Sequence, residues 1–209
     1  MFLRLSTVRL VAIAAFVLAA VAARGARADG LTVDETSHLL EGQSVARTQD
    51  LTRGSRRYVG GVTYTVIDGT LDDVATVLDD VRYWRRFLPK TRDARRVGSV
   101  DGDPLVRVTH GSAIVQVGYV LRVHREGNVV RFWMDESREH DIEDAWGFFR
   151  AEPMGDGRTL MTYGILVDMG DGLLRDLFEP RMRQLALDVP VLVRDVVLER
   201  QARGRRAAR

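Results

Sequence analysis

The fold is decided by residues 104–138, which read PLVRVTHGSAIVQVGYVLRVHREGNVVRFWMDESR. Apolar and polar side chains alternate along this stretch, as they do in strands with one buried face. The turn residues Glu126-Gly127-Asn128 mark a break between two strands. We therefore expect antiparallel strands at 104–112, 114–125 and 128–138. Their inward-facing side chains should be Val106, Val108 and His110, then Val115, Val117, Tyr119, Leu121 and Val123, and finally Val130, Phe132 and Met134.

Four more segments have the length and pattern of strands, at 58–68, 92–101, 141–152 and 158–169. The breaks Asp101-Gly102-Asp103-Pro104 and Gly155-Asp156-Gly157 carry turn chemistry. In the last segment the inward face should hold Met161, Tyr163, Ile165 and Val167. The segment 141–152 is ambiguous, because either Trp146 with Phe148 or Ala145 with Phe149 could face inward.

Helices are predicted on both sides of these strands. A capping box at Thr32–Glu35 opens a short helix at 33–41, and residues 43–57 form a connector with room for one edge strand. Two short helices should follow the first long strand, the second of them closed by Pro89. Apolar residues at three- and four-residue steps predict a helix from 173 to 198, kinked at Pro190. This order is an α+β layout in which a seven-stranded sheet curls around the C-terminal helix.

Two stretches carry a family resemblance. Val77-Leu78-Asp79-Asp80-Val81-Arg82-Tyr83-Trp84-Arg85-Arg86-Phe87-Leu88-Pro89 resembles a signature of the START-like, polyketide cyclase and coenzyme Q-binding families of the Bet v 1-like superfamily. The second stretch, Trp146–Pro153 followed by a Gly-rich turn and Arg158–Tyr163, is similar to another of their motifs. The resemblance covers about Val59 to Leu198. It implies the helix-grip fold, with an apolar tunnel between sheet and C-terminal helix for a lipid, sterol, quinone or polyketide.

The charges are distributed unevenly. The formal net charge is +2, but residues 1–28 hold four arginines and no acidic group, and the last ten residues hold five arginines. Residues 29–199 therefore have 22 basic against 29 acidic side chains, a charge of −7. A body of this charge has no reason to bind nucleic acid.

Residues 1–28 have the pattern of a secretory signal, with an apolar run from Leu10 to Ala23 and a cleavage site after Ala28. We expect the mature protein to be periplasmic or secreted. The domains expected are the signal peptide at 1–28, the helix and connector at 29–57, a START-like domain at 58–200 and a basic tail at 201–209. The tail could touch an anionic membrane or form a solvated helix end.

The resemblance together with the strand pattern nominates the residues that line the tunnel. They are Val108, His110, Val117, Tyr119, Phe132, Met134, Phe149, Tyr163, Ile165, Met182 and Leu185. The same side chains could equally form a plain packed core.

His110 is the candidate catalytic residue, as a general acid or base, unless its ring is bonded to the backbone or to water. The cluster His140–Asp144 offers no metal site, because only His140 and Asp144 share a side of a strand with Ile142. No metal or cofactor is expected, and GxxxxGK[ST], GxSxG and HExxH motifs do not occur.

Three functions follow. The first is an exported carrier of a lipid, sterol, hopanoid or quinone. The second is a polyketide cyclase-like enzyme that uses the same tunnel, with His110 and Tyr119 or Tyr163 as its polar groups. The third is a structural or interaction domain with a filled core, for which the resemblance would signify fold only.

Overall fold

The computed structural model describes residues 30–171, 179, 181 and 183–207. The chain forms two compact units, one up to Ser37 and one from His38 onward. The predicted signal peptide lies outside the described residues. In the described part of the first unit, Thr32 and Glu35 make the predicted capping box: the Thr32 amide donates to Glu35 Oε2 at 2.7 Å, and the Glu35 amide donates to Thr32 Oγ1 at 3.1 Å. Helix α2 begins there and spans Val33–Leu40.

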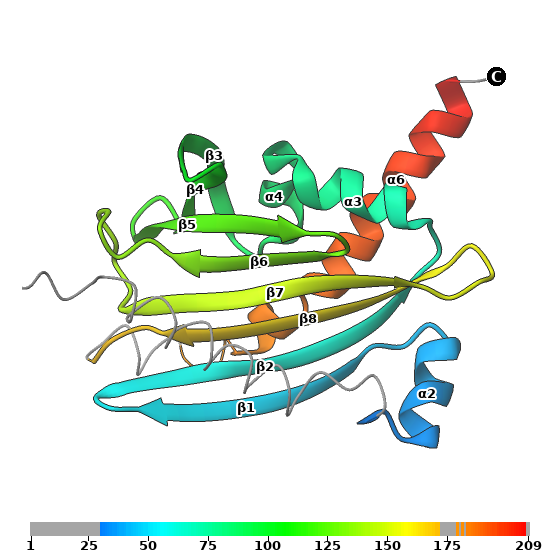
Figure 1. Ribbon diagram of the computed structural model, residues 1–209, viewed down its shortest axis with the longest axis horizontal. Helices are drawn as coiled ribbons and strands as arrows, with labels where there is room; N and C mark the ends of the chain where they lie inside the picture. Colours follow the sequence, from blue (N-terminus) through cyan, green and yellow to red (C-terminus); the bar gives the residue numbers. More distant parts are fainter. Residues whose placement is uncertain (1–29, 172–178, 180, 182, 208–209) are drawn as a thin grey trace, which may run out of the picture. The chain divides into compact units, whose positions relative to one another are not determined.

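The second unit is built on one antiparallel sheet of eight strands, in the order β1-β2-β8-β7-β6-β5-β4-β3. The strands are β1 Val45–Arg53, β2 Arg56–Ile67, β3 Thr91–Val100, β4 Asp103–Gly111, β5 Gln116–Glu126, β6 Val129–Met134, β7 Asp144–Pro153 and β8 Thr159–Asp168. Consecutive strands from β3 to β8 are neighbours, so the meander is as expected. Figure 1 shows β1 and β2 beside β8, at the opposite side of the sheet from β3.

The expectation of seven strands was wrong, because β1 fills most of the predicted connector at 43–57. It pairs with β2 along its whole length, from Val45 opposite Tyr64 to Arg53 opposite Arg56. None of its nine residues is fully buried. A strand at the edge of a sheet, without a buried face, shows no apolar alternation, and the sequence pattern therefore left an edge strand in this connector open without predicting it.

Several other strand boundaries differ from the prediction by one to four residues, and two of these differences have a clear local cause. Strand β5 begins at Gln116, not at 114, because the Ser112 hydroxyl accepts the amides of Ile114 and Val115 and forms a hairpin loop. Strand β6 ends at Met134, since Asp135 starts a turn in which its carboxylate accepts the Ser137 amide.

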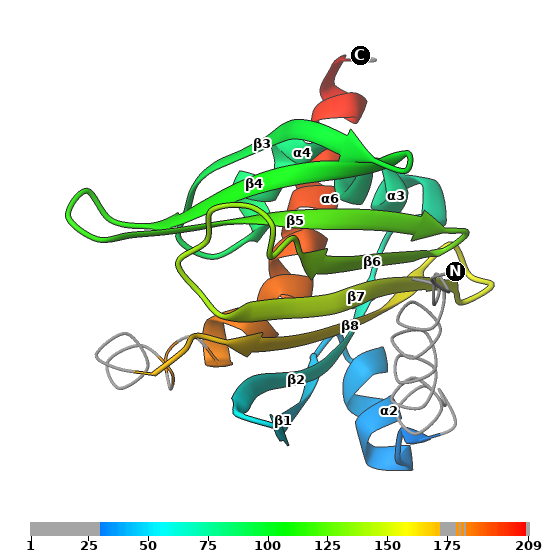
Figure 2. The ribbon, with the colours of Figure 1, turned by 60° about the vertical axis from the view of Figure 1, so that its left-hand side comes forward.

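Three helices lie on one face of this sheet: α3 Leu71–Asp79, α4 Val81–Phe87 and α6 Val189–Ala207 (Figures 1 and 2). The C-terminal helical segment is interrupted, not merely kinked. Residues 183–187 are helical, a turn follows at Asp188, and Pro190 lies in the first turn of α6, where its missing amide costs nothing. None of the described helices has the length and apolar character needed to cross a bilayer.

The core lies between the sheet and these helices. It contains Val106, Val108, Leu121, Val123, Val130, Phe132, Met161, Tyr163 and Ile165 from the predicted inward faces. The ambiguous strand β7 turns Ala145, Phe149 and Ala151 inward. Phe148 faces the other way, and its ring covers Gly164, where a side chain would collide with it.

Candidate functional site

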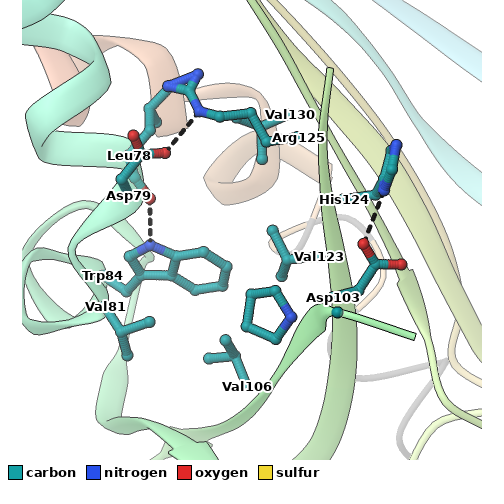
Figure 3. A pocket seen from close by; sticks show the side chains of 12 residues that line it. Leu78, Asp79, Val81, Trp84, Asp103, Val106, Val123, His124, Arg125 and Val130 are labelled. Atoms are coloured by element: carbon teal, nitrogen blue, oxygen red, sulfur yellow. Dashed lines mark hydrogen bonds and ion pairs between the residues drawn. The ribbon is translucent and has the colours of Figure 1, made fainter. Parts of the chain in front are cut away.

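A cavity of about 260 Å³ opens between the α3–α4 corner and the ends of β4, β5 and β6. Its floor is apolar and consists of Leu78, Val81, Trp84, Pro104, Val106, Val123 and Val130 (Figure 3). The helices supply the first three of these side chains and the sheet supplies the others. Strand parity places Val106, Val123 and Val130 on the concave face, and the corner between the two helices places the rest opposite them.

Local capping shapes that corner. Thr70 and Asp73 form a capping box at the start of α3, and the Asp80 carboxylate accepts the Arg82 amide at 3.0 Å at the start of α4. The indole Nε1 of Trp84 donates to the Leu78 carbonyl oxygen at 2.9 Å. This bond satisfies the one polar atom of the indole and turns its apolar face toward the cavity (Figure 3).

The rim of the cavity is charged. On the helix side, Arg125 Nε donates to Asp79 Oδ1 at 2.9 Å. On the hairpin side, His124 Nδ1 and Asp103 Oδ1 are 2.7 Å apart. Burial raises the pKa of the Asp79 carboxyl above its usual value, although Arg125 opposes the rise. Burial acts in the same direction on Asp103, but hydrogen bonds from His124 and Arg122 outweigh it and lower the pKa of that carboxyl.

Further inward, an aromatic cluster occupies the space between sheet and helices. The ring centroid of Phe149 lies 4.7 Å from that of Tyr163, 5.6 Å from that of Phe132 and 6.2 Å from that of Phe87. Each of the four residues is at least 94 % buried. The nominated tunnel residues Phe132, Phe149 and Tyr163 therefore pack on one another, together with Val108 and Ile165 of the same core.

His110 and Tyr119 lie at the opposite end of β4 and β5 from the cavity. Nδ1 of His110 is 3.0 Å from the Pro89 carbonyl oxygen and 3.0 Å from Thr91 Oγ1, and Nε2 is 2.8 Å from Tyr119 Oη. A carbonyl oxygen only accepts, so Nδ1 carries the proton. Burial lowers the pKa of the imidazole, although the bond to Pro89 opposes this, so Nε2 accepts the Tyr119 hydroxyl. Both ring nitrogens are thus engaged, one of them with the backbone.

The remaining nominated residues are spread around this core. Val117 and Met134 pack in a small cluster with Ile142, Ala145 and Tyr119. Leu185 is half-buried, while Leu187 is the core residue of that turn and its carbonyl oxygen accepts the Thr63 hydroxyl at 2.9 Å. Met182 lies outside the described residues.

His140 and Asp144 turn to different partners. Nδ1 of His140 donates to the Ile142 carbonyl oxygen at 2.7 Å, and the Asp144 carboxylate accepts the Tyr58 hydroxyl at 2.8 Å. In the described ranges, no three side chains of the metal-ligating types come together.

The sequence did not single out the cavity residues. Leu78, Val81 and Trp84 stand in the signature stretch, and Val106, Val123 and Val130 were placed on inward faces. The family signature and the strand parity could therefore both have pointed to these residues. The sequence could not predict where along the strands the α3–α4 corner lies. This position decides where a cavity remains between the helices and the sheet.

No family model and no curated protein matches the amino-acid sequence. Solved structures with a similar fold do match. A STAR-related lipid transfer protein from Xanthomonas axonopodis has 15 % identity and a TM-score of 0.58, over 74 % of this chain and 93 % of that one. Human STARD10 has 9 % identity and a TM-score of 0.56, over 86 % of both chains. The Zhui aromatase/cyclase from Streptomyces sp. R1128 has 19 % identity and a TM-score of 0.53, over 78 % of this chain and 98 % of that one. The expected helix-grip fold is confirmed.

Proposed function

We propose that this protein binds and carries a small hydrophobic molecule in the cavity between the α3–α4 corner and the sheet. The observation that carries the proposal is the contrast within the cavity. Seven apolar side chains form its floor, and the Arg125–Asp79 ion pair and the His124–Asp103 hydrogen bond form its rim. An amphiphile fits such a site, with its apolar part on the floor and its polar end at the rim. The names of two similar structures, a lipid transfer protein and STARD10, make a lipid or a related apolar compound the first class to test.

Export of the mature protein after Ala28 belongs to the same proposal. A hydrophobic molecule that crosses an aqueous compartment needs a protein that shields its apolar surface. The exposed arginines at the end of α6, Arg203, Arg205 and Arg206, would add a contact with anionic lipid where the molecule is loaded. Mass spectrometry of the co-purifying molecule, described below, will distinguish a sterol, a hopanoid and a quinone as the cargo.

Catalysis by His110 is not part of the proposal. Its ring nitrogens are already bonded to Pro89, Thr91 and Tyr119, and its side chain does not line the cavity. A cyclase-like reaction would need a polar group that faces the bound substrate.

Native mass spectrometry tests the proposal on protein that is produced through its own export route. We expect a co-purifying apolar molecule, released on denaturation. The variant Val123→Phe places a ring in the cavity and should lose this molecule, whereas the matched variant Val97→Phe, at a residue that is 40 % exposed, should keep it. If the wild type carries no molecule and an uncharged fluorescent probe such as N-phenyl-1-naphthylamine does not bind, the core is simply filled and the proposal is wrong.

A further inference from the structure

The two edges of the sheet differ in how well they are protected against pairing with another strand. Strand β3, at one edge, has register shifts between Thr91 and Asp93 and between Arg96 and Gly98. Such irregularities bend a strand and make it a poor template for a further strand. Strand β1, at the other edge (Figure 1), pairs with β2 over nine consecutive residues without a shift, and it contains no proline or lysine. No described strand pairs with its outer side, so β1 is a regular strand with an open edge.

The middle of β1 is open above and below the sheet. Thr48 and Gln49 are exposed. The residues opposite them on β2 are Gly61 and Gly60, which have no side chains to cover them. A side chain at Gly61 is excluded, because its Cβ would lie 2.0 Å from the Arg47 carbonyl oxygen. Space is therefore left around Thr48 and Gln49 for the side chains of a neighbouring strand.

The charges of β1 limit the registers in which a second copy of the same strand can pair with it. In an antiparallel pair with two-fold symmetry, one residue lies opposite its own copy at the axis. An axis at Arg47 or at Asp50 would place like charges directly opposite each other, which is destabilising. An axis at Thr48 or at Gln49 places no like charges opposite each other.

The axis at Thr48 matches the side chains better than the axis at Gln49. Its cross-strand pairs are Val45 with Leu51, Ala46 with Asp50, Arg47 with Gln49, and Thr48 with its own copy. Val45 and Leu51 are the two half-buried residues of β1, and this register brings them together on the face of the sheet away from the helices. The axis at Gln49 would place Leu51 opposite an arginine instead. The small Ala46 opposite Asp50 also leaves room for the Asp50–Arg183 ion pair of 2.7 Å.

We propose that β1 is a homodimer interface, at which two copies of this chain pair antiparallel around a two-fold axis at Thr48. The pairing joins the two eight-stranded sheets into one continuous sheet. The inference goes beyond the carrier function and does not depend on it. The sheet side of the cavity is built by β4, β5 and β6, and β2, β8 and β7 separate these strands from β1, so both cavities stay open in the dimer.

Sedimentation equilibrium of the purified protein tests the interface. We expect a reversible equilibrium between monomer and dimer. Thr48→Lys places a lysine opposite its own copy at the axis and should raise the dissociation constant about fivefold, because like charges meet there. The matched control Val97→Lys, at an exposed residue of β3, should leave the constant unchanged. A wild type that stays monomeric at millimolar concentration, or a dimer that Thr48→Lys does not weaken, would overturn the proposal.

Single cysteines test the register, since the chain contains no cysteine of its own. Residues directly opposite each other in an antiparallel pair have Cα atoms about 4.5 or 5.5 Å apart, which a disulfide can bridge. Thr48→Cys should therefore form a disulfide-linked dimer under mild oxidation. Gln49 and its copy would be about 8 Å apart, too far for a disulfide, so Gln49→Cys should cross-link much more slowly.

Val97→Cys reports the rate of cross-linking by random collision and should also be slow. Faster cross-linking of Gln49→Cys than of Thr48→Cys, or equal rates for all three variants, would contradict the two-fold axis at Thr48. These results would leave the carrier function intact, because native mass spectrometry detects the bound molecule in monomer and dimer alike. Conversely, a dimer that carries no apolar molecule would confirm the interface and refute the carrier function.

Discussion

Phe149→Ala tests whether the middle of the core is closed by packed aromatic rings. Phe149 is 4 % exposed, and its ring lies between those of Phe87, Phe132 and Tyr163. Truncation leaves a cavity on the order of 100 Å³, which at about 24 cal/mol per Å³ amounts to roughly 2.4 kcal/mol. The lost transfer of the ring from water adds roughly 2 kcal/mol. The free energy of unfolding should therefore fall by about 4 kcal/mol.

Urea unfolding, followed by tryptophan fluorescence, measures this change. The exposed variant Val97→Ala is the control and should alter the free energy by less than about 0.5 kcal/mol. The new space should also bind benzene, so that benzene raises the melting temperature of Phe149→Ala and not that of the wild type. A loss below about 1 kcal/mol would show that Phe149 is not tightly packed, and the description of the middle of the core as closed by aromatic rings would then be wrong.

Three further changes test the framework of the site. In Gly147→Ala the new Cβ would lie 2.6 Å from Phe132 Cζ and collide with the Gly164 carbonyl oxygen, so urea unfolding should show a loss of about 1–3 kcal/mol; an unchanged midpoint would contradict the close approach. Burial lowers the pKa of His110 below its ordinary 6.5, so the unfolded chain binds a proton before the folded chain does and stability falls as the pH is lowered through 6.5. In His110→Gln the free energy of unfolding should depend less on pH between pH 7.5 and 5. A steeper fall in the variant would refute the view that His110 causes the loss of stability at low pH. Thr70→Ala removes the cap of α3 and should cost about 1 kcal/mol by thermal unfolding, whereas no change would show that the cap does not hold the helix.

The inward faces of β4, β5, β6 and β8 could be predicted from the sequence, whereas that of β7 stayed ambiguous. The distance between facing layers could not be predicted for any strand. A period of two assigns Val123 and Phe132 to the concave side whatever lies opposite them. Whether they meet another side chain depends on the sheet curvature and on where the α3–α4 corner sits. That is why the residues expected to line a tunnel include Phe132, Phe149 and Tyr163, which touch one another, and omit Trp84, which faces the open cavity.

The sequence pattern also could not predict hydrogen bonds between residues that are far apart in the chain. The inward position of His110 followed from strand parity, but its bond to Pro89 depends on how α4 ends against β3. Tyr163 is a similar case: an inward tyrosine was predicted, but only the structure shows that its ring packs against those of Phe149 and Phe132. Periodicity carries no information on such pairings, because they join residues far apart in the chain.

The size of the cavity sets a condition on any larger ligand. Pockets for drug-sized molecules have about 300–1,000 Å³, and the cavity here, at about 260 Å³, lies just below that range. A sterol-sized molecule must therefore displace Phe132 and its neighbours, and the lost ring contacts subtract from its affinity. Conversely, a variant in which the cluster is already disrupted avoids this cost. The affinity for a large ligand should therefore rise in Phe149→Ala while the stability of the unliganded protein falls, and the two changes together would identify the aromatic cluster as the element that limits ligand size.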